Sequence, residues 1–177
     1  MINRNFTSFP VLTTERLTLR QLLIDDQQDI FALRSDSEIN KYIERKPSKT
    51  IEDAINFINA VNDNIKKNNS LYWVITLTKT KTFVGTICLF DFSDETNSCE
   101  IGYELMIAFQ GQGIMREATE KVIDYAFQTL QFQKIVALTH KENENSIKLL
   151  SKFNFLQSKD AYEENPDFNI FTLSYLN

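Results

Sequence analysis

Glycine, proline, cysteine and histidine are all scarce in this chain. Its 177 residues include four glycines, three prolines, two cysteines and one histidine. Two cysteines are too few for a disulfide framework, and although Cys88 and Cys99 could meet across neighbouring strands, we expect reduced thiols. The single histidine, His140, has no cluster of cysteines or histidines around it. The sequence therefore predicts no metal site.

Long apolar runs and an excess of basic residues are also missing. The longest apolar runs, such as residues 101–107, are interrupted and far shorter than the roughly 20 residues that cross a bilayer, so no membrane partner is expected. The first residues lack the apolar core of a signal peptide, which makes the cytoplasm the expected location. A net charge of −5 offers no basic face for nucleic acid. A hydrophobic content of 42% is that of a globular protein, and the length suits one domain over residues 1–177, with its core in residues 12–175.

Hydrophobic periodicity predicts alternating strands and helices. Leu17 and Leu19 alternate with polar residues, as in a first strand, and residues 50–65 carry an apolar helical face that begins at the N-cap Thr50. Three β-rich runs joined by polar turns predict an antiparallel meander over residues 71–107. Further helices are expected at residues 25–36, 114–130 and 143–154, and further strands at 134–140, 155–162 and 169–176. The order β-α-α-β-β-β-α-β-α-β-β predicts an α/β fold with one mixed, mostly antiparallel sheet of about seven strands and four helices.

Two of the four glycines, Gly111 and Gly113, stand directly before one of these helices. Glycine permits positive φ and a close approach of the backbone to a ligand, and a helix N-terminus attracts anions. The pair is equally compatible with an ordinary turn from strand to helix. No Gly-Lys-Ser/Thr follows, which excludes a Walker loop, and Arg116 stands where a dinucleotide fingerprint needs its third glycine.

Three segments in the correct order resemble one family. They are "TTERLTLRQL" (residues 13–22), "EIGYELMIAFQGQGIMREA" (100–118) and "NENSIKLLSKFNF" (143–155). Together they are similar to the GCN5-related N-acetyltransferase (GNAT) superfamily, in the branch that acetylates the N-termini of ribosomal proteins. The resemblance covers residues 12–175 and implies a transfer of acetyl from acetyl-coenzyme A to a primary amine.

The resemblance also implies which residues hold acetyl-coenzyme A. The backbone of the turn at residues 110–115 would hold the pyrophosphate, and the end of the preceding strand would pair with the pantetheine arm. Asn143 would hydrogen-bond the pantetheine at the start of the later helix. The implied cofactor-binding residues are Leu105, Met106, Ile107, Gln110, Gly111, Gln112, Gly113, Ile114, Met115, Asn143 and Ser146.

The chain departs from the family pattern at the acid and base. A tyrosine that many relatives use to protonate the departing thiolate is replaced by Leu150, and a glutamate that some relatives place on the strand before Asn143 is replaced by Leu138. Glu100, in the "EIGY" run, is the expected base for the attacking amine, which is mostly protonated at neutral pH. Ser146 or a water molecule is the expected proton donor to the thiol. A backbone N–H near Leu105 and Met106 would meet the oxyanion.

The acceptor is left open by the sequence. A protein N-terminus, a polyamine, an amino acid or an antibiotic all fit, and the acidic loop over residues 159–169 modestly favours a cationic amine. A non-catalytic module that holds acyl-coenzyme A is the alternative, because Leu138 and Leu150 replace the usual acid and base. A homodimer is slightly favoured over a monomer. The other suggestive side chains are expected mainly in packing or surface roles: Trp73, Phe90, Phe92, Tyr103 and His140. Arg116, at the start of a helix, is equally compatible with a phosphate contact and with a surface role.

Overall fold

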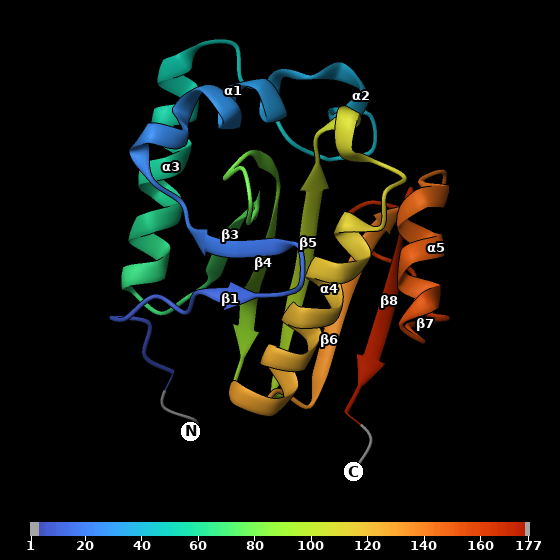
Figure 1. Cartoon of the computed structure of the whole chain (residues 1–177). Coiled ribbons are helices and arrows are strands. Elements are labelled where there is room, and N and C mark those ends of the chain that lie inside the picture. The colour runs from blue at the N-terminus through green and yellow to red at the C-terminus, as the bar shows by residue number, and fades with distance from the viewer. Residues whose placement is uncertain (1–3, 176–177) are drawn as a thin grey trace.

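The alternating leucines of the N-terminal segment do form a strand, and it belongs to one mixed sheet. The computed structural model describes residues 4–175 and shows an eight-stranded sheet with helices on both faces (Figure 1). The strands are β1 (Leu12–Thr13), β2 (Leu17–Gln21), β3 (Leu71–Leu77), β4 (Phe83–Ser93), β5 (Ser98–Leu105), β6 (Lys134–His140), β7 (Leu156–Gln157) and β8 (Phe168–Ser174). The α-helices are α1 (Gln27–Ser35), α2 (Ser37–Asn40), α3 (Ile51–Lys66), α4 (Ile114–Asp124) and α5 (Glu144–Lys152).

The sheet order is β1-β2-β3-β4-β5-β6-β8-β7. Every neighbouring pair is antiparallel except β5 and β6, which run parallel. The paired part of β5 and β6 is short, since it joins only Ser98–Glu100 to Lys134–Val136. Beyond Glu100 and Val136, β5 continues to Leu105 and β6 to His140 without pairing with each other. The two strands therefore separate in the middle of the sheet and leave a wedge between them.

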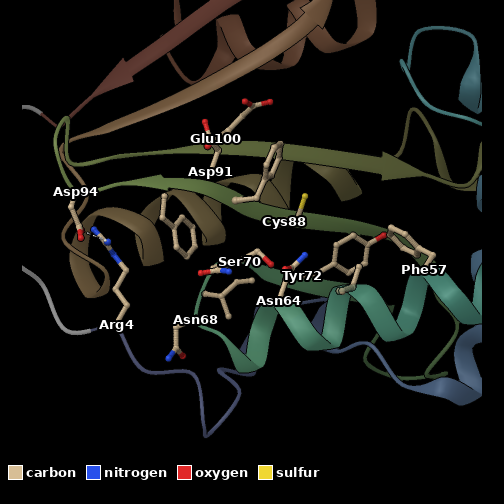
Figure 2. A pocket seen from close by; sticks show the side chains of 15 residues that line it. Arg4, Phe57, Asn64, Asn68, Ser70, Tyr72, Cys88, Asp91, Asp94 and Glu100 are labelled. Carbon is tan, nitrogen blue, oxygen red and sulfur yellow. Dashed lines mark hydrogen bonds and ion pairs between the residues drawn. The ribbon is translucent and has the colours of Figure 1, made fainter.

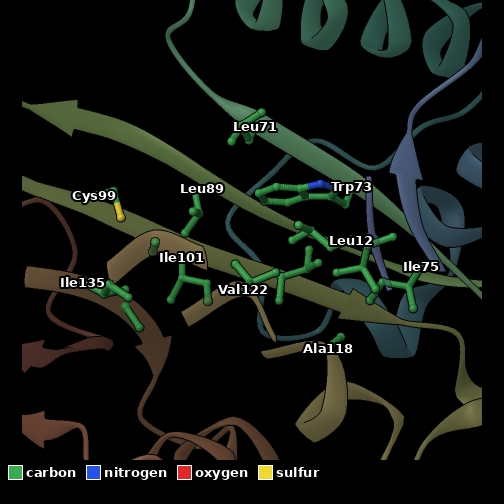
Figure 3. Packing of buried hydrophobic residues seen from close by; sticks show 14 of the residues in the cluster. Leu12, Leu71, Trp73, Ile75, Leu89, Cys99, Ile101, Ala118, Val122 and Ile135 are labelled. Carbon is green, nitrogen blue, oxygen red and sulfur yellow. The ribbon is translucent and has the colours of Figure 1, made fainter. Parts of the chain in front are cut away.

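Each face of the sheet has its own core. One face packs α4 and α5 against Trp73, Ile101 and their neighbours, and Figure 3 shows Ala118 and Val122 among these buried side chains. The other face packs α1 and α3 against β3 through a smaller cluster that includes Ile30, Ile58 and Val74. Burial of apolar side chains on both sides fixes the register of the central strands, because a slip of one residue would exchange the two faces.

The predicted fold class is confirmed, with three differences in detail. Two short elements, β1 and α2, were not predicted because they are too short to show periodicity; α2 begins where the Asp36 carboxylate accepts from the N–H groups of Glu38 and Ile39. The helix expected at residues 114–130 is α-helical to Asp124 and continues as a π-helical turn over Tyr125–Thr129. The closing hairpin is real, but β8 lies between β6 and β7, and β7 holds only two residues.

The described residues were compared with what a membrane span and a metal site each require. Between residues 4 and 175, no helix is both long and apolar enough to cross a membrane. The same part of the chain brings no three His, Cys, Asp or Glu side chains together as a metal site would require. Cys88 and Cys99 are both free thiols, and burial raises the pKa of each to about 12.

Candidate active site

A groove of about 1040 Å³ runs through the wedge between β5 and β6. Its walls include Ile101–Leu105 of β5, Ala137 and Leu138 of β6, and the start of α5. One end reaches the glycine turn before α4, and the other passes below α2 and the loop that follows it. The groove thus crosses the sheet at the place where its backbone pairing is interrupted.

The glycine turn adopts the backbone that its sequence suggested. Gly111 and Gly113 have φ of 73° and 75°, in the left-handed region that disfavours other residues. Gly113 is the N-cap of α4 and offers no side-chain cap, and no partner is found among the described residues for the N–H groups of Ile114 and Met115. A side chain at Gly111 would meet nothing within 4 Å, so the turn is open on that side.

Side chains from elsewhere hold this turn in place. Arg16, next to β2, donates to the carbonyl oxygen of Gln112 at 3.1 Å and to the Glu117 carboxylate at 2.6 Å. Thr14 and the Arg16 N–H donate to the other oxygen of Glu117 at 2.5 and 3.0 Å. Within the turn, the Gln110 amide donates to the Leu105 carbonyl oxygen at 3.1 Å. The first hairpin of the chain therefore fixes both the turn and the first turn of α4.

At the end of β5, every second residue turns its backbone N–H and C=O groups toward the groove. The Met106 N–H donates to the Val84 carbonyl oxygen at 2.9 Å, so it belongs to the β4 side of the strand. In an antiparallel pair every second residue bonds the neighbour, so the backbone groups of Tyr103 and Leu105 face the wedge. Leu105 and Ile107 line the groove, whereas the Met106 side chain packs on the smaller core. Of the two residues near which a free N–H is expected, Leu105 turns its backbone to the wedge and Met106 does not.

At the start of α5, Asn143 and Ser146 both line the groove. The Asn143 Oδ1 caps the helix by accepting from the Ser146 N–H at 3.2 Å, which leaves its Nδ2 group available. Ser146 Oγ lies 2.8 Å from the hydroxyl of Tyr103, which reaches across the wedge from β5. Burial raises the pKa of Tyr103 to about 12, so its hydroxyl keeps its proton at neutral pH.

Tyr103 is a groove residue to which the sequence assigns no site role. Alternation along the strand predicts that it lies on the face opposite Glu100, and it does pack against the larger core as expected. Its hydroxyl, however, lies at the groove, next to the helix that carries Leu150. Leu150 itself is fully buried.

Glu100 is the last residue of β5 that pairs with β6, so it stands where the wedge opens. Its side chain lies on the face opposite Tyr103, and it lines both the groove and a second hollow of about 1130 Å³. Figure 2 shows Glu100 next to Asp91 of β4, with Tyr72 and Phe57 further along the same hollow. Burial and the nearby Asp91 carboxylate raise the pKa of Glu100 to about 7. A carboxyl group with that pKa can both take and hold a proton near neutral pH.

The acidic loop between β7 and β8 lies near the groove mouth. Tyr162 lines the groove and donates to Glu164 at 2.7 Å, and Asn165 donates to Glu44 of the loop after α2 at 3.0 Å. Asp167 pairs instead with Lys141. Part of the loop thus contributes to the groove, and part of it holds neighbouring segments together.

The remaining suggestive side chains divide between packing and the groove. Trp73 is fully buried and donates from its indole to the Pro10 carbonyl oxygen at 2.7 Å, as expected of a core residue. His140 lies between the rings of Tyr42 and Phe168 and accepts from the Glu142 N–H. Phe90, Leu138 and Arg116 do line the groove.

The chain is similar to proteins of one family over most of its length. The model of the acetyltransferase (GNAT) domain matches residues 16–156. The uncharacterized N-acetyltransferase p20 of Bacillus licheniformis is 36% identical over 145 residues, covering 81% of each chain. The uncharacterized N-acetyltransferase YoaA of Bacillus subtilis is 33% identical over 147 residues, covering 83% of each chain. The chain belongs to the GNAT family of acetyltransferases.

Solved structures support the same fold. The ribosomal-protein-S5-alanine acetyltransferase from Vibrio fischeri superimposes with a TM-score of 0.79 and 22% identity, covering 93% of this chain and 96% of that one. The spermidine N-acetyltransferase from Vibrio cholerae, solved with CoA and spermine, gives a TM-score of 0.79 and 23% identity over 91% of this chain and 96% of that one. At this identity the likeness establishes the fold alone.

Proposed function

We propose that the chain transfers an acetyl group from acetyl-coenzyme A to a primary amine. The observation that carries this proposal is the wedge between β5 and β6. It has an anion-binding helix start at one end and a carboxyl group with a pKa of about 7 where it opens. Family membership and relatives that are named N-acetyltransferases support it.

The residues around the groove fit coenzyme A. The free N–H groups at the start of α4 suit a pyrophosphate, and Arg116, Lys148 and Lys152 add positive charge along the same wall. Pantetheine carries amide groups that would pair with the backbone of Leu105 and Ile107 and with the Asn143 amide. Gln110 and Gln112 act by shaping the turn through their bonds to the Leu105 and Ala108 carbonyl oxygens.

Glu100 acts as the base in this proposal. The amine nitrogen attacks the thioester carbonyl carbon, the new N–C bond forms, and the amine proton passes to Glu100 directly or through water. The negative oxygen that develops on the carbonyl carbon is met by a backbone N–H that faces the wedge, that of Tyr103 or Leu105. When the C–S bond breaks, the sulfur takes a proton from the Tyr103 and Ser146 hydroxyl pair. Base and acid thus reach the reaction from opposite faces of the sheet.

The test measures release of the coenzyme A thiol from acetyl-coenzyme A, together with the mass of the product, against alkylamines, polyamines, amino acids and N-terminal peptides. Acetylation of any amine supports the proposal; saturable binding of acetyl-coenzyme A without transfer to any acceptor supports the non-catalytic alternative instead.

Glu100→Gln should lower kcat/KM by roughly 10²- to 10⁴-fold, the range for a lost general base. Affinity for acetyl-coenzyme A should change little, since backbone groups further along the chain hold it. In the wild type the rate should rise with pH through about 7, the pKa of Glu100, and in the variant this limb should move to higher pH. A variant with full activity at every pH and amine concentration would remove Glu100 from the mechanism.

A further inference from the structure

Arg34, at the end of α1, carries a charge that the mechanism above does not use. Its side chain lines the groove on the Glu100 face of the sheet, and its guanidinium carbon lies 3.8 Å from the centre of the Phe57 ring. Among residues 4–175, no carboxylate lies within 4.0 Å of this guanidinium, and its buried Nε group has no hydrogen-bond partner. Arg34 is partly buried, and a charge removed from water without a counter-ion in contact is costly, so a partner for it is expected.

The neighbouring Glu104 carboxylate attracts Arg34 but makes no ion-pair contact with it. Arg45 pairs with Glu104 of β5, and both side chains are largely buried, with 11% and 15% of their surface exposed. One polar atom on each of them, Arg45 Nη2 and Glu104 Oε2, also lacks a partner. Two guanidinium groups and one carboxylate leave this cluster with one positive charge. Burial and the charge of Arg45 lower the pKa of Arg34 more than the attraction of Glu104 raises it, and a bound anion would reverse this balance.

The cluster of Arg34, Arg45 and Glu104 lies at one end of a part of the groove that we call the chamber, and Glu100 lies at its other end. Glu100 and Glu104 lie on the same face of β5, four residues apart, which separates their backbones by about 13 Å. Phe57, Tyr72 and Thr86 line the chamber between them. One end therefore carries the carboxyl group that would take an amine proton, and the other carries an unpaired positive charge.

We propose that Arg34 binds an anionic group of the acceptor, so that the acceptor is a small amine that also carries a carboxylate or a phosphate. This inference rests on the proposed function, because it assigns the acceptor of the same site. A guanidinium offers planar paired donors that match either anion. A polyamine presents only positive charge to this end of the chamber and is disfavoured there.

The test compares acceptors that differ only in the group far from the amine. Unbranched ω-amino carboxylates of increasing length are measured against alkylamines and α,ω-diamines of the same length, with ω-aminoalkyl phosphates as a further arm. The wild type should prefer a carboxylate or phosphate member over its matched alkylamine by about 10- to 100-fold in kcat/KM, the range for one hydrogen bond to a charged group. The relative rates of the two anionic arms identify which anion the site takes.

Variants at Arg34 assign the preference to this side chain. Arg34→Gln should lower the ratio of anionic to neutral acceptor at least tenfold, mainly through KM, and Arg34→Lys should restore part of it. Lys66→Gln, which removes an exposed cation of α3 that pairs with Asp63, is the matched control and should leave the ratio unchanged. A wild type that prefers diamines, or an Arg34→Gln variant that loses all acceptors in equal proportion, overturns the proposal.

A binding measurement separates this proposal from the proposed function. Calorimetry of the preferred ω-amino carboxylate against protein saturated with coenzyme A needs no turnover. Binding that Arg34→Gln weakens at least tenfold supports the anionic subsite even if no acetyl transfer is found, in which case only the proposed function fails. Absence of binding by every anionic member, with acetyl transfer to neutral amines, overturns the subsite and leaves the proposed function standing.

Discussion

Glu100 and Tyr103 lie three residues apart on β5, and because strand side chains alternate they face opposite surfaces of the sheet. Glu100 faces the chamber that Arg34 also lines, whereas Tyr103 faces α5 and bonds Ser146. Burial raises the pKa of both side chains, to about 7 and about 12. Two groups whose pKa values differ in this way suit the two proton transfers of an acyl transfer, one as base and one as acid.

Tyr103→Phe should separate these two roles. Removing the hydroxyl should lower kcat about tenfold or less with acetyl-coenzyme A, because a thiol with an ordinary pKa near 8.5 is a good leaving group that water can protonate. KM for the amine should hold, since the acceptor chamber is on the other face. Steady-state kinetics check this, and Ser146→Ala, which leaves the tyrosine hydroxyl in place, is the companion variant. A Tyr103→Phe enzyme with unchanged kcat and raised KM for the amine would contradict the assignment to the acid.

The sequence predicts some of the groove-lining residues and not others. Asn143, Ser146 and the glycine turn occupy motif positions, so the resemblance predicts them, and they do line the groove. Tyr103 cannot be predicted in this way, because alternation gives the face of a residue but not what else lines that face. Arg34 carries no motif, and its place beside Glu104 depends on a contact between distant segments. The sequence could not tell which of Leu105 and Met106 turns its N–H to the wedge, because the alternation of backbone bonds along β5 depends on its register with β4.

At the scale of elements, the turn before α4 is built by parts of the chain that are far apart in sequence. Arg16 and Thr14 of the first hairpin bond Glu117 and the Gln112 carbonyl oxygen, and both glycines hold left-handed backbone. Because the Glu117 carboxylate accepts from Thr14 and Arg16, it does not cap the first N–H groups of α4, and these groups stay available to an anion. The geometry of the turn therefore depends on Gly113 keeping its φ of 75°.

Gly113→Val should weaken binding of acetyl-coenzyme A at least tenfold, because a β-branched residue strains a left-handed backbone and the turn must shift. Gly113→Asn is the matched control: asparagine adopts this conformation more readily and should lose less affinity. Calorimetry measures both, with circular dichroism to check the fold. Equal affinity for the valine variant and the wild type would show that the turn does not hold the pyrophosphate.

Elements with strong local signals were predicted well. Thr50 caps α3 and bonds the Asp53 N–H, while the Asp53 carboxylate accepts from the Thr50 N–H, as their spacing indicated. Asn154, two residues after the end of α5, has a φ of 61°, a left-handed conformation that asparagine adopts more readily than most residues. The π-helical turn after α4 and the two-residue strands carry no such signal, because tertiary packing rather than local propensity sets their ends.

At the scale of the whole molecule, the separation of β5 and β6 opens the sheet to both faces. Helices α4 and α5 frame one side, and α1, α2 and α3 frame the other (Figure 1). A donor and an acceptor can then enter from different sides and meet where the strands part, which converts their reaction into one between positioned groups. The two edge strands, β1 and β7, hold two residues each, so little edge is left for pairing with another sheet, and the homodimer stays a prediction.

The same opening has a consequence for stability. Glu100 is largely buried, and its pKa rises from 4.5 to about 7. Between these pH values the folded protein keeps a proton that the unfolded chain has lost, so the free energy of unfolding should fall as pH rises through this window. The full loss of unfolding free energy, present above pH 7, is on the order of 1–3 kcal/mol.

Glu100→Gln removes the titration, so chemical denaturation should find the variant more stable than the wild type at pH 8, with the difference shrinking toward pH 4.5. Asp63→Asn, which removes an exposed carboxylate on α3, should reproduce none of this pH dependence. A Glu100→Gln difference that is the same at both pH values would mean that Glu100 titrates as an ordinary surface carboxylate, and the base assigned to the wedge would lose its physical basis.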